Sequence, residues 1–302
     1  MRGILWGVAG FLALVGGTIG GLAFYGARVL TRRRAPDTPA SPADYGLYFQ
    51  DITFPSRDGL TLCGWFIPAE SPRGTVIFGH GHAGSMDPDL RYAPTFHDRG
   101  YNVLMFDFRA HGRSDGRLVS MGSLEQLDLL GAVDYLRGRG IERLGVLGFS
   151  MGGRVAISTA PQTEAIAAVV SDGGPATILE AIAAGSREQG LPGFLALPVA
   201  RLTLWLAGRW IGCNLSDADA IYWASRLSPR ALFLIHGGCD PYVSTVAVEA
   251  LFDAAGEPKE LWIAPKAGHR EVDELHPDTY LERIIGFFDR YLATDSHLSR
   301  IS

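Results

Sequence analysis

Two serines in this 302-residue chain stand at the centre of a Gly-x-Ser-x-Gly pattern, which is typical of the nucleophile turn of serine hydrolases. Ser114 lies in "GRSDG" (112–116) and Ser150 lies in "GFSMG" (148–152). The chemistry requires a buried strand before the serine and a helix after it, so that the hydroxyl is held exposed on a sharp bend. Only Ser150 follows an apolar run and precedes a helix-like segment. The context therefore predicts Ser150 as the nucleophile.

A serine nucleophile needs a histidine to take its proton and a carboxylate to orient that histidine. In proteins with a nucleophile turn of this kind, the three catalytic residues occur along the chain in the order serine, acid, histidine. We predict Asp240, in "LIHGGCDPYVS", as the acid and His269, in "WIAPKAGHREV", as the base, because each follows an apolar strand-like run. Asp172, at the end of "AVVSD", is the alternative acid. The competing interpretations are a turn or helix-capping aspartate at 240 and a surface-loop histidine at 269.

Acyl transfer also needs N–H donors for the oxyanion, commonly the residue after the nucleophile and one from the loop after the first parallel strand. Met151 supplies the first donor by position. The loop "FGHGHAGS" (78–85) is expected to supply the second, from His82 or alternatively Ala83. His80 and His82 also form a His-x-His pair that could bind a metal, but no further ligands cluster nearby in the sequence.

The segments that must position these residues are short apolar runs separated by helix-length stretches. A hairpin-like pair of runs (48–70) is followed by six continuous runs, at 75–80, 102–108, 143–149, 166–172, 231–237 and 260–266. Such runs predict a mostly parallel sheet of about eight strands with helices on both faces, an α/β fold. Active sites of parallel sheets gather at the carboxyl ends of the strands, where every candidate residue falls.

About 58 residues, 173–230, separate the fourth and fifth of these runs, more than one crossover needs. We expect a helical cap insertion here. Its apolar middle, Leu191 to Gly212, is either a buried crossover helix or an apolar lid that contributes to substrate binding. Pro192 and Pro198 disfavour a second membrane span.

The sequence of the amino terminus predicts a membrane anchor. Residues 3–27 are uncharged, and as a helix they would rise roughly 37 Å, enough to cross a hydrocarbon core. A cleaved signal peptide is the alternative, with a weak cleavage site at 21–23. Arg28 and Arg32 to Arg34 follow the segment, so the positive-inside rule predicts a cytoplasmic catalytic domain, with export as the alternative. The expected organisation is an anchor (1–34), a Pro-rich linker (35–44), a catalytic domain (45–293) and a tail (294–302).

Composition excludes several other classes of protein. Hydrophobic residues make up 47% and charged residues 20%, which suits one large globular core. The chain beyond residue 34 has 22 basic and 32 acidic residues, which argues against a nucleic-acid partner. Three widely spaced cysteines indicate neither a disulfide framework nor a metal site.

Together, "HG" at 80–81, "RGYNVLMFDFRAHGRSDG" (99–116), the turn at Ser150, "HGGCD" (236–240) and "AGH" (267–269) resemble the α/β-hydrolase superfamily over about residues 46–293. The resemblance implies that Ser114 lies in a structural loop and that no metal or organic cofactor is needed. The anchor, the oxyanion loop and the modest cap are similar to membrane-anchored esterases, monoacylglycerol lipases and acyl-thioesterases of this superfamily.

The expected activity is hydrolysis of carboxylic esters or thioesters through an acyl-enzyme on Ser150, without a cofactor. An anchor and an apolar cap favour acyl or lipid-like substrates. The sequence leaves open a serine aminopeptidase, for which Glu180 or Glu188 could grip a free amino terminus, and an acyltransferase. It also leaves open a non-catalytic membrane scaffold, and it does not determine the oligomeric state.

Overall fold

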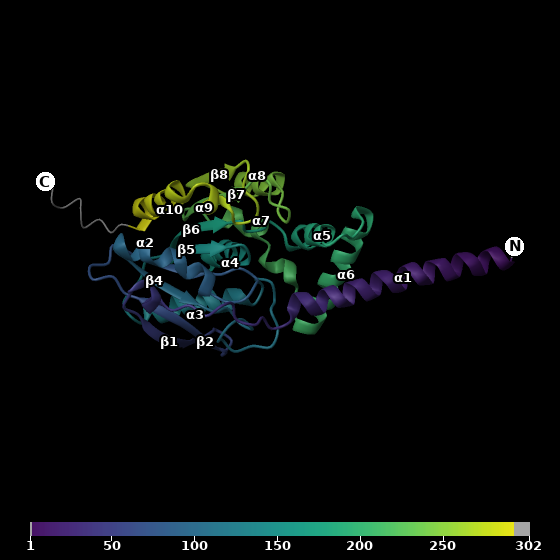
Figure 1. The fold of residues 1–302 in the computed structure, drawn as a ribbon, viewed down its shortest axis with the longest axis horizontal. Coiled ribbons are helices and arrows are strands. Elements are labelled where there is room, and N and C mark those ends of the chain that lie inside the picture. Colours follow the sequence, from purple (N-terminus) through teal and green to yellow (C-terminus); the bar gives the residue numbers. More distant parts are fainter. Residues whose placement is uncertain (1, 293–302) are drawn as a thin grey trace.

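The protein is built on one twisted eight-stranded sheet, as seen in a computed structural model that describes residues 2–292 (Figure 1). The strands are β1 (Gln50–Pro55), β2 (Thr61–Ile67), β3 (Gly74–Gly79), β4 (Tyr101–Phe106), β5 (Leu144–Phe149), β6 (Ile166–Asp172), β7 (Ala231–Gly237) and β8 (Lys259–Ala264). Their spatial order is β1-β2-β4-β3-β5-β6-β7-β8. Strand β2 is antiparallel to both neighbours and the other pairings are parallel.

The predicted fold class is confirmed, and the six apolar runs coincide with β3 to β8 within two residues at nearly every end. Strands β4, β5 and β7 are buried along their whole length, which explains why their sequences are continuously apolar rather than alternating. The hairpin forms the β1–β2 edge of the sheet, and β8 is the half-buried edge on the other side.

Helices cover both faces of the sheet. One face carries α2 (Ala93–Asp98), α9 (Val272–Leu275) and α10 (Pro277–Leu292), and the other carries α3 (Glu125–Arg137), α4 (Met151–Thr159), α7 (Ala220–Trp223) and α8 (Thr245–Ala254). Short 3-10 turns are η1 (Pro42–Tyr45), η2 (Asp87–Tyr92), η3 (Ala160–Gln162), η4 (Leu215–Ala218) and η5 (Ala224–Arg226). Helix α10 buries Tyr280, Ile284 and Phe288, at four-residue spacing, so that one apolar stripe packs on the sheet.

The insertion between β6 and β7 contains two longer helices, α5 (Ile178–Glu188) and α6 (Gly193–Ile211). They pack on each other, and α6 also packs on the first helix of the chain. Much of α6 stays uncovered, although its sequence is apolar.

Helix α1 (Arg2–Thr31) begins the chain and projects away from the rest of the molecule (Figure 1). Its last turns pack on α6, where Ala23 and Ala27 are fully buried. By length and composition alone, Ala13–Thr31 and Gly193–Ile211 are both long and apolar enough to cross a membrane.

The residues after α1, which composition marks as a linker, make specific contacts with two loops of the domain. The backbone N–H of Arg34 donates to the carbonyl of Ala110 at 2.8 Å. Asp37 and Ser85 exchange two hydrogen bonds, one from each backbone N–H to the other side chain. The segment is therefore fixed along the carboxyl edge of the parallel strands.

Candidate active site

Ser150 occupies a strained turn between β5 and α4. Its backbone angles, φ 51° and ψ −113°, are rare for a residue with a side chain. A Cβ on Gly152 would lie 2.0 Å from the carbonyl oxygen of Gly79, and one on Gly148 would lie 2.4 Å from that of Gly152. Only glycine fits at either position, so both glycines of the pattern are sterically required by the bend at Ser150.

The structure brings Ser150, His269 and Asp240 together from three loops at the carboxyl edge of the sheet. The hydroxyl oxygen of Ser150 lies 3.0 Å from Nε2 of His269, and Nδ1 of His269 lies 2.6 Å from a carboxylate oxygen of Asp240. With the ring proton on Nδ1 donated to Asp240, Nε2 is free to accept the proton of the Ser150 hydroxyl. This tautomer is the one that general-base catalysis by His269 requires.

Asp240 is held firmly in place. Its other carboxylate oxygen accepts hydrogen bonds from the backbone N–H groups of Tyr242, at 2.8 Å, and Val243, at 3.1 Å. The side chain is fully shielded from solvent, and the ring of Tyr242 packs edge-on against His269. The loop after β7 therefore fixes both the carboxylate and the imidazole beside it.

The side chains of the two competing candidates, Asp172 and Ser114, have other partners. The buried Asp172 side chain accepts a hydrogen bond from the hydroxyl of Tyr280 at 2.8 Å, and burial raises its pKa to about 6. Ser114 donates to the carbonyl of Asp107 and accepts from the backbone N–H of Cys63. Those bonds tie the loop after β4 to β2 and occupy the Ser114 hydroxyl.

The loop after β3 lies against the nucleophile turn. A Cβ on Gly81 would lie 3.4 Å from the Cβ of Ser150, so the backbone of this loop passes directly beside the nucleophile. The N–H of Met151 opens helix α4, where first-turn N–H groups have no partner within the helix. The assignment of Met151 and His82 as oxyanion donors stays a prediction, and these positions support it.

The side chain of His82 is bonded to the amino-terminal segment. Its Nε2 lies 2.9 Å from the carbonyl oxygen of Leu30 and 2.8 Å from the guanidinium of Arg34, and its Nδ1 lies 3.2 Å from the same guanidinium. Burial and the neighbouring Arg34 lower the pKa of His82 to about 3, so the ring is neutral. The backbone carbonyl of His82 is in turn 3.0 Å from Nε2 of His111.

His80 is also fully engaged. Its Nδ1 lies 2.7 Å from the carbonyl oxygen of Gly81, and its Nε2 accepts from the backbone N–H of Phe108 at 2.9 Å. Burial lowers the pKa of His80 well below its usual value. The ring of His80 therefore connects the loops after β3 and β4 by hydrogen bonds.

Arg270 is a site residue that sequence reasoning missed. It follows His269 directly, pairs with the buried Asp89 and stacks over the ring of Phe149, with 4.3 Å from guanidinium carbon to ring centre. These contacts pin the His269 loop to the end of β5. Asp89 is 181 residues away in the chain, and no local pattern links the two.

The structure gives no hydrogen bond between the cap residues proposed for substrate binding and the candidate catalytic residues, within the part of the chain that it describes. Glu180 and Glu188 lie exposed on α5. Helix α6 packs on α1, α5 and η4, so a substrate-binding role for Leu191 to Gly212 stays a prediction.

This strand order, with a serine on a glycine-flanked bend and a histidine and an acid on later loops, defines a protein of the α/β-hydrolase type. The chain belongs to the alpha/beta hydrolase fold family, whose profile matches residues 74–219. It is 31% identical over 251 residues to YfhR of Escherichia coli, covering 79% of this chain and 80% of that protein. It is 30% identical over 243 residues to YqkD of Bacillus subtilis, covering 79% and 78%.

Among solved structures, the chain is similar to the esterase Pf2001 of Pyrococcus furiosus, with a TM-score of 0.72 and 28% identity. That similarity covers 86% of this chain and 99% of the esterase. The esterase domain of a Rhodothermus marinus protein, at 19% identity and a TM-score of 0.61, shares the fold. The family and the likeness to the Pyrococcus furiosus esterase support a hydrolase.

Proposed function

We propose that this protein is a serine hydrolase that cleaves carboxylic ester or thioester bonds through an acyl-enzyme on Ser150. The observation that carries the proposal is the connected line of Ser150, His269 and Asp240, with separations of 3.0 and 2.6 Å. The likeness to an esterase of Pyrococcus furiosus supports ester bonds as the substrate class.

In the first half of the reaction, the Ser150 oxygen attacks the substrate carbonyl while His269 Nε2 takes the hydroxyl proton. The carbonyl oxygen becomes an oxyanion, for which the N–H groups of Met151 and His82 are the proposed donors. His269 then gives its proton to the departing alcohol or thiol. Asp240 stabilises the imidazolium throughout, and its two backbone N–H donors keep it oriented as the acceptor.

In the second half, water attacks the acyl-Ser150 ester, with His269 again acting first as base and then as acid. The oxyanion meets the same two donors, and the carboxylic acid product leaves with Ser150 restored. All bonds made and broken in this cycle involve only the substrate, water and residues of this chain.

We further propose that α1 anchors the protein in a membrane, with the catalytic domain in the cytoplasm. Arg28 and the arginines at 32–34 lie at the domain end of the helix, which fits the positive-inside rule. Ala23 and Ala27 are buried against α6, so cleavage at 21–23 would cut within a packed helix. This packing favours a retained anchor over a signal peptide. The substrates that fit this placement are small or lipid-like acyl esters.

The test is to measure hydrolysis of p-nitrophenyl esters from acetyl to palmitoyl by the full chain in detergent, together with labelling by a fluorophosphonate probe. We expect Ser150→Ala to abolish labelling and to lower kcat by about 10⁴-fold or more. Ser114→Ala is the matched control, since it alters the other Gly-x-Ser-x-Gly serine, and it should still be labelled. An unlabelled wild-type protein would contradict the proposal and favour the scaffold alternative, and labelling of Ser150→Ala would contradict the choice of nucleophile.

A further inference from the structure

Helix α6 presents large apolar side chains to the outside of the molecule. Phe194 is 79% exposed and Trp205 is 61% exposed, and Leu197 and Trp210 are also exposed. Phe194, Leu197 and Trp205 fall on one side of the helix, and an exposed apolar face of this kind marks a binding surface rather than an ordinary protein surface.

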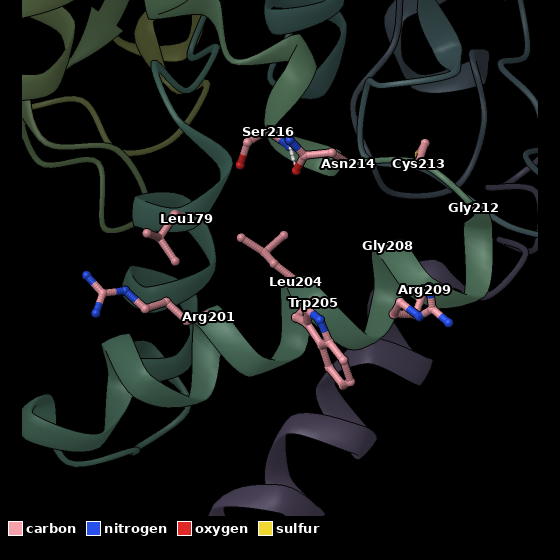
Figure 2. A pocket seen from close by; sticks show the side chains of 10 residues that line it. All are labelled: Leu179, Arg201, Leu204, Trp205, Gly208, Arg209, Gly212, Cys213, Asn214 and Ser216. Carbon is pink, nitrogen blue, oxygen red and sulfur yellow. Dashed lines mark hydrogen bonds between the residues drawn. The ribbon is translucent and has the colours of Figure 1, made fainter.

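Helix α6 packs against α1 where α1 leaves the domain. The hydroxyl of Thr203 donates to the carbonyl of Ala23 at 3.4 Å, and the ring of Phe24 meets that of Trp210 edge-on at 5.3 Å. In Figure 1, α6 crosses the base of α1 at a steep angle. Figure 2 shows Trp205 pointing to the side along which α1 continues, while Leu204 points the opposite way, into a groove of about 650 Å³ facing α5.

The charge on α6 is of one sign. Between residues 189 and 216 the chain has two arginines, Arg201 and Arg209, and no acidic residue, although the protein as a whole is acidic. Both arginines line the rim of the groove in Figure 2. Tryptophan, phenylalanine and leucine beside arginine, with no acid, is the composition of helices that lie in the headgroup region of an anionic membrane.

Both ends of α6 return to the domain, so the helix lies along a membrane surface rather than through it. The end before α6 continues from α5, whose Gly185 lies against Tyr242. The end after it is fixed by Leu215, whose carbonyl accepts from the buried Arg154. A spanning helix would carry one of these ends across a hydrocarbon core of about 30 Å, away from the domain.

We propose that α6 is a second membrane contact, which lies flat in the lipid–water interface beside the entry point of α1 and binds anionic phospholipid through Arg201 and Arg209. The inference rests on the proposed anchoring by α1. The aromatic face of α6 inserts at the boundary between headgroups and acyl chains, and the two arginines reach the lipid phosphates beside it.

The test places an environment-sensitive fluorophore on single cysteines in the full chain, in which Cys63, Cys213 and Cys239 are replaced by serine. The labelled variants are Leu14→Cys in α1, Trp205→Cys in α6 and, as a matched control, Tyr48→Cys. Tyr48 is an aromatic residue of similar exposure, 68%, and precedes β1 at the amino edge of the parallel strands. Each protein is reconstituted into vesicles of phosphatidylcholine with or without phosphatidylglycerol, and quenching by spin-labelled lipid is compared with quenching by iodide in the water.

We expect lipid quenching at positions 14 and 205, shallower at 205, and iodide quenching at 48. If 14 is quenched by lipid but 205 by iodide, the inference is wrong while the anchor stands. If neither is quenched by lipid, the proposed anchoring fails as well. If the label at 205 is shielded from both quenchers, a second copy of the chain covers α6 and the inference is again wrong.

A separate experiment tests the preference of α6 for anionic lipid. The double variant Arg201→Gln and Arg209→Gln should remove the dependence of lipid quenching at 205 on phosphatidylglycerol. Each arginine lost should weaken the equilibrium constant for contact of α6 with the anionic membrane by roughly fivefold. Arg99→Gln with Arg143→Gln makes the same change of charge before β4 and β5, at the opposite edge, and should leave that dependence intact. Equal effects of the two pairs would show a general charge effect and would overturn the phosphate contact.

Discussion

Two aspartates near the nucleophile differ in what their side chains touch, and this decides their roles. Asp240 accepts from His269 and from two backbone N–H groups, whereas Asp172 meets the hydroxyl of Tyr280. Both follow strands of the same sheet edge, so their spacing in the sequence does not separate them. The structure brings Asp240, and not Asp172, within hydrogen-bond distance of His269.

Asp240→Asn should lower kcat by about 10⁴-fold, because the amide favours the His269 tautomer that cannot accept the Ser150 proton. Asp172→Asn, the matched change at the neighbouring strand, should lower kcat by less than about tenfold. Steady-state ester hydrolysis and the rate of fluorophosphonate labelling give the comparison. Equal losses in the two variants would contradict the assignment of the acid.

Asp172 also predicts a pH dependence of stability. Burial raises its pKa from 3.8 to about 6, so the folded chain holds a proton that the unfolded chain releases between those values. Stability is therefore lost as the pH rises from 4 to above 6, by about 3 kcal/mol for this one group.

Asp172→Asn should flatten that part of the stability profile, since the amide cannot ionise and can still accept from Tyr280. Urea unfolding of the full chain in detergent at several pH values, wild type against variant, measures the difference. Parallel profiles for the two proteins would exclude Asp172 as the source.

At the scale of elements, the sheet and its nucleophile turn could be predicted from sequence because their signals are local. Strands buried on both faces are continuously apolar, and the bend at Ser150 requires glycine at two fixed positions. The amino-terminal segment gave no such signal. Its contacts are made by backbone groups and by Arg34 and Asp37 to loops about fifty or more residues away, and a Pro-rich composition resembles a tether.

The cap shows the same limit. Leu191 to Gly212 is apolar in sequence, which indicates a buried crossover helix or an apolar lid, while Pro192 and Pro198 disfavour a membrane span. What separates these is which neighbours cover the helix, and α1 and α5 cover only part of it. Arg270 was missed for a related reason, since its partner Asp89 belongs to a distant element.

The contact between the amino-terminal segment and the loop after β3 makes a prediction at this scale. Arg34→Ala removes the donor to His82 and also its bond to the carbonyl of Val29, so the loop after β3, which carries the proposed oxyanion donor, loses this support. We expect kcat to fall between about 10- and 100-fold with KM little changed, which is less than loss of a whole oxyanion donor. Arg34→Lys should recover part of the activity, because it keeps one donor.

Arg33→Ala is the control for this prediction. Arg33 donates to the carbonyls of Gly112 and Gly116 in the neighbouring loop and does not contact His82. Its loss removes the same charge from the same segment. If Arg33→Ala and Arg34→Ala reduce kcat alike, the effect comes from the fold of the segment and not from the position of His82.

For the molecule as a whole, the arrangement places the chemistry on the side from which α1 leaves. Strands β5 and β6 point toward that side in Figure 1, and the carbonyl of Leu30 touches the loop after β3 directly. Helix α1, the cap helix α6 and the candidate catalytic loops thus share one end of the protein. No single sequence motif encodes this arrangement, which follows from the parallel sheet and from where α1 joins it.

Helix α1 joins the domain without a flexible linker, and this determines which substrates the candidate active site can reach. Thr31 ends the helix, and Arg32 already pairs with Leu118 as an isolated β-bridge. With α1 in a bilayer, no flexible linker lets the domain move independently of the helix. The depth of α1 in the bilayer then fixes the distance between the domain and the lipid surface. Substrates would then be chosen by how far their ester bond lies from the membrane plane, before any pocket measures the length of the acyl chain.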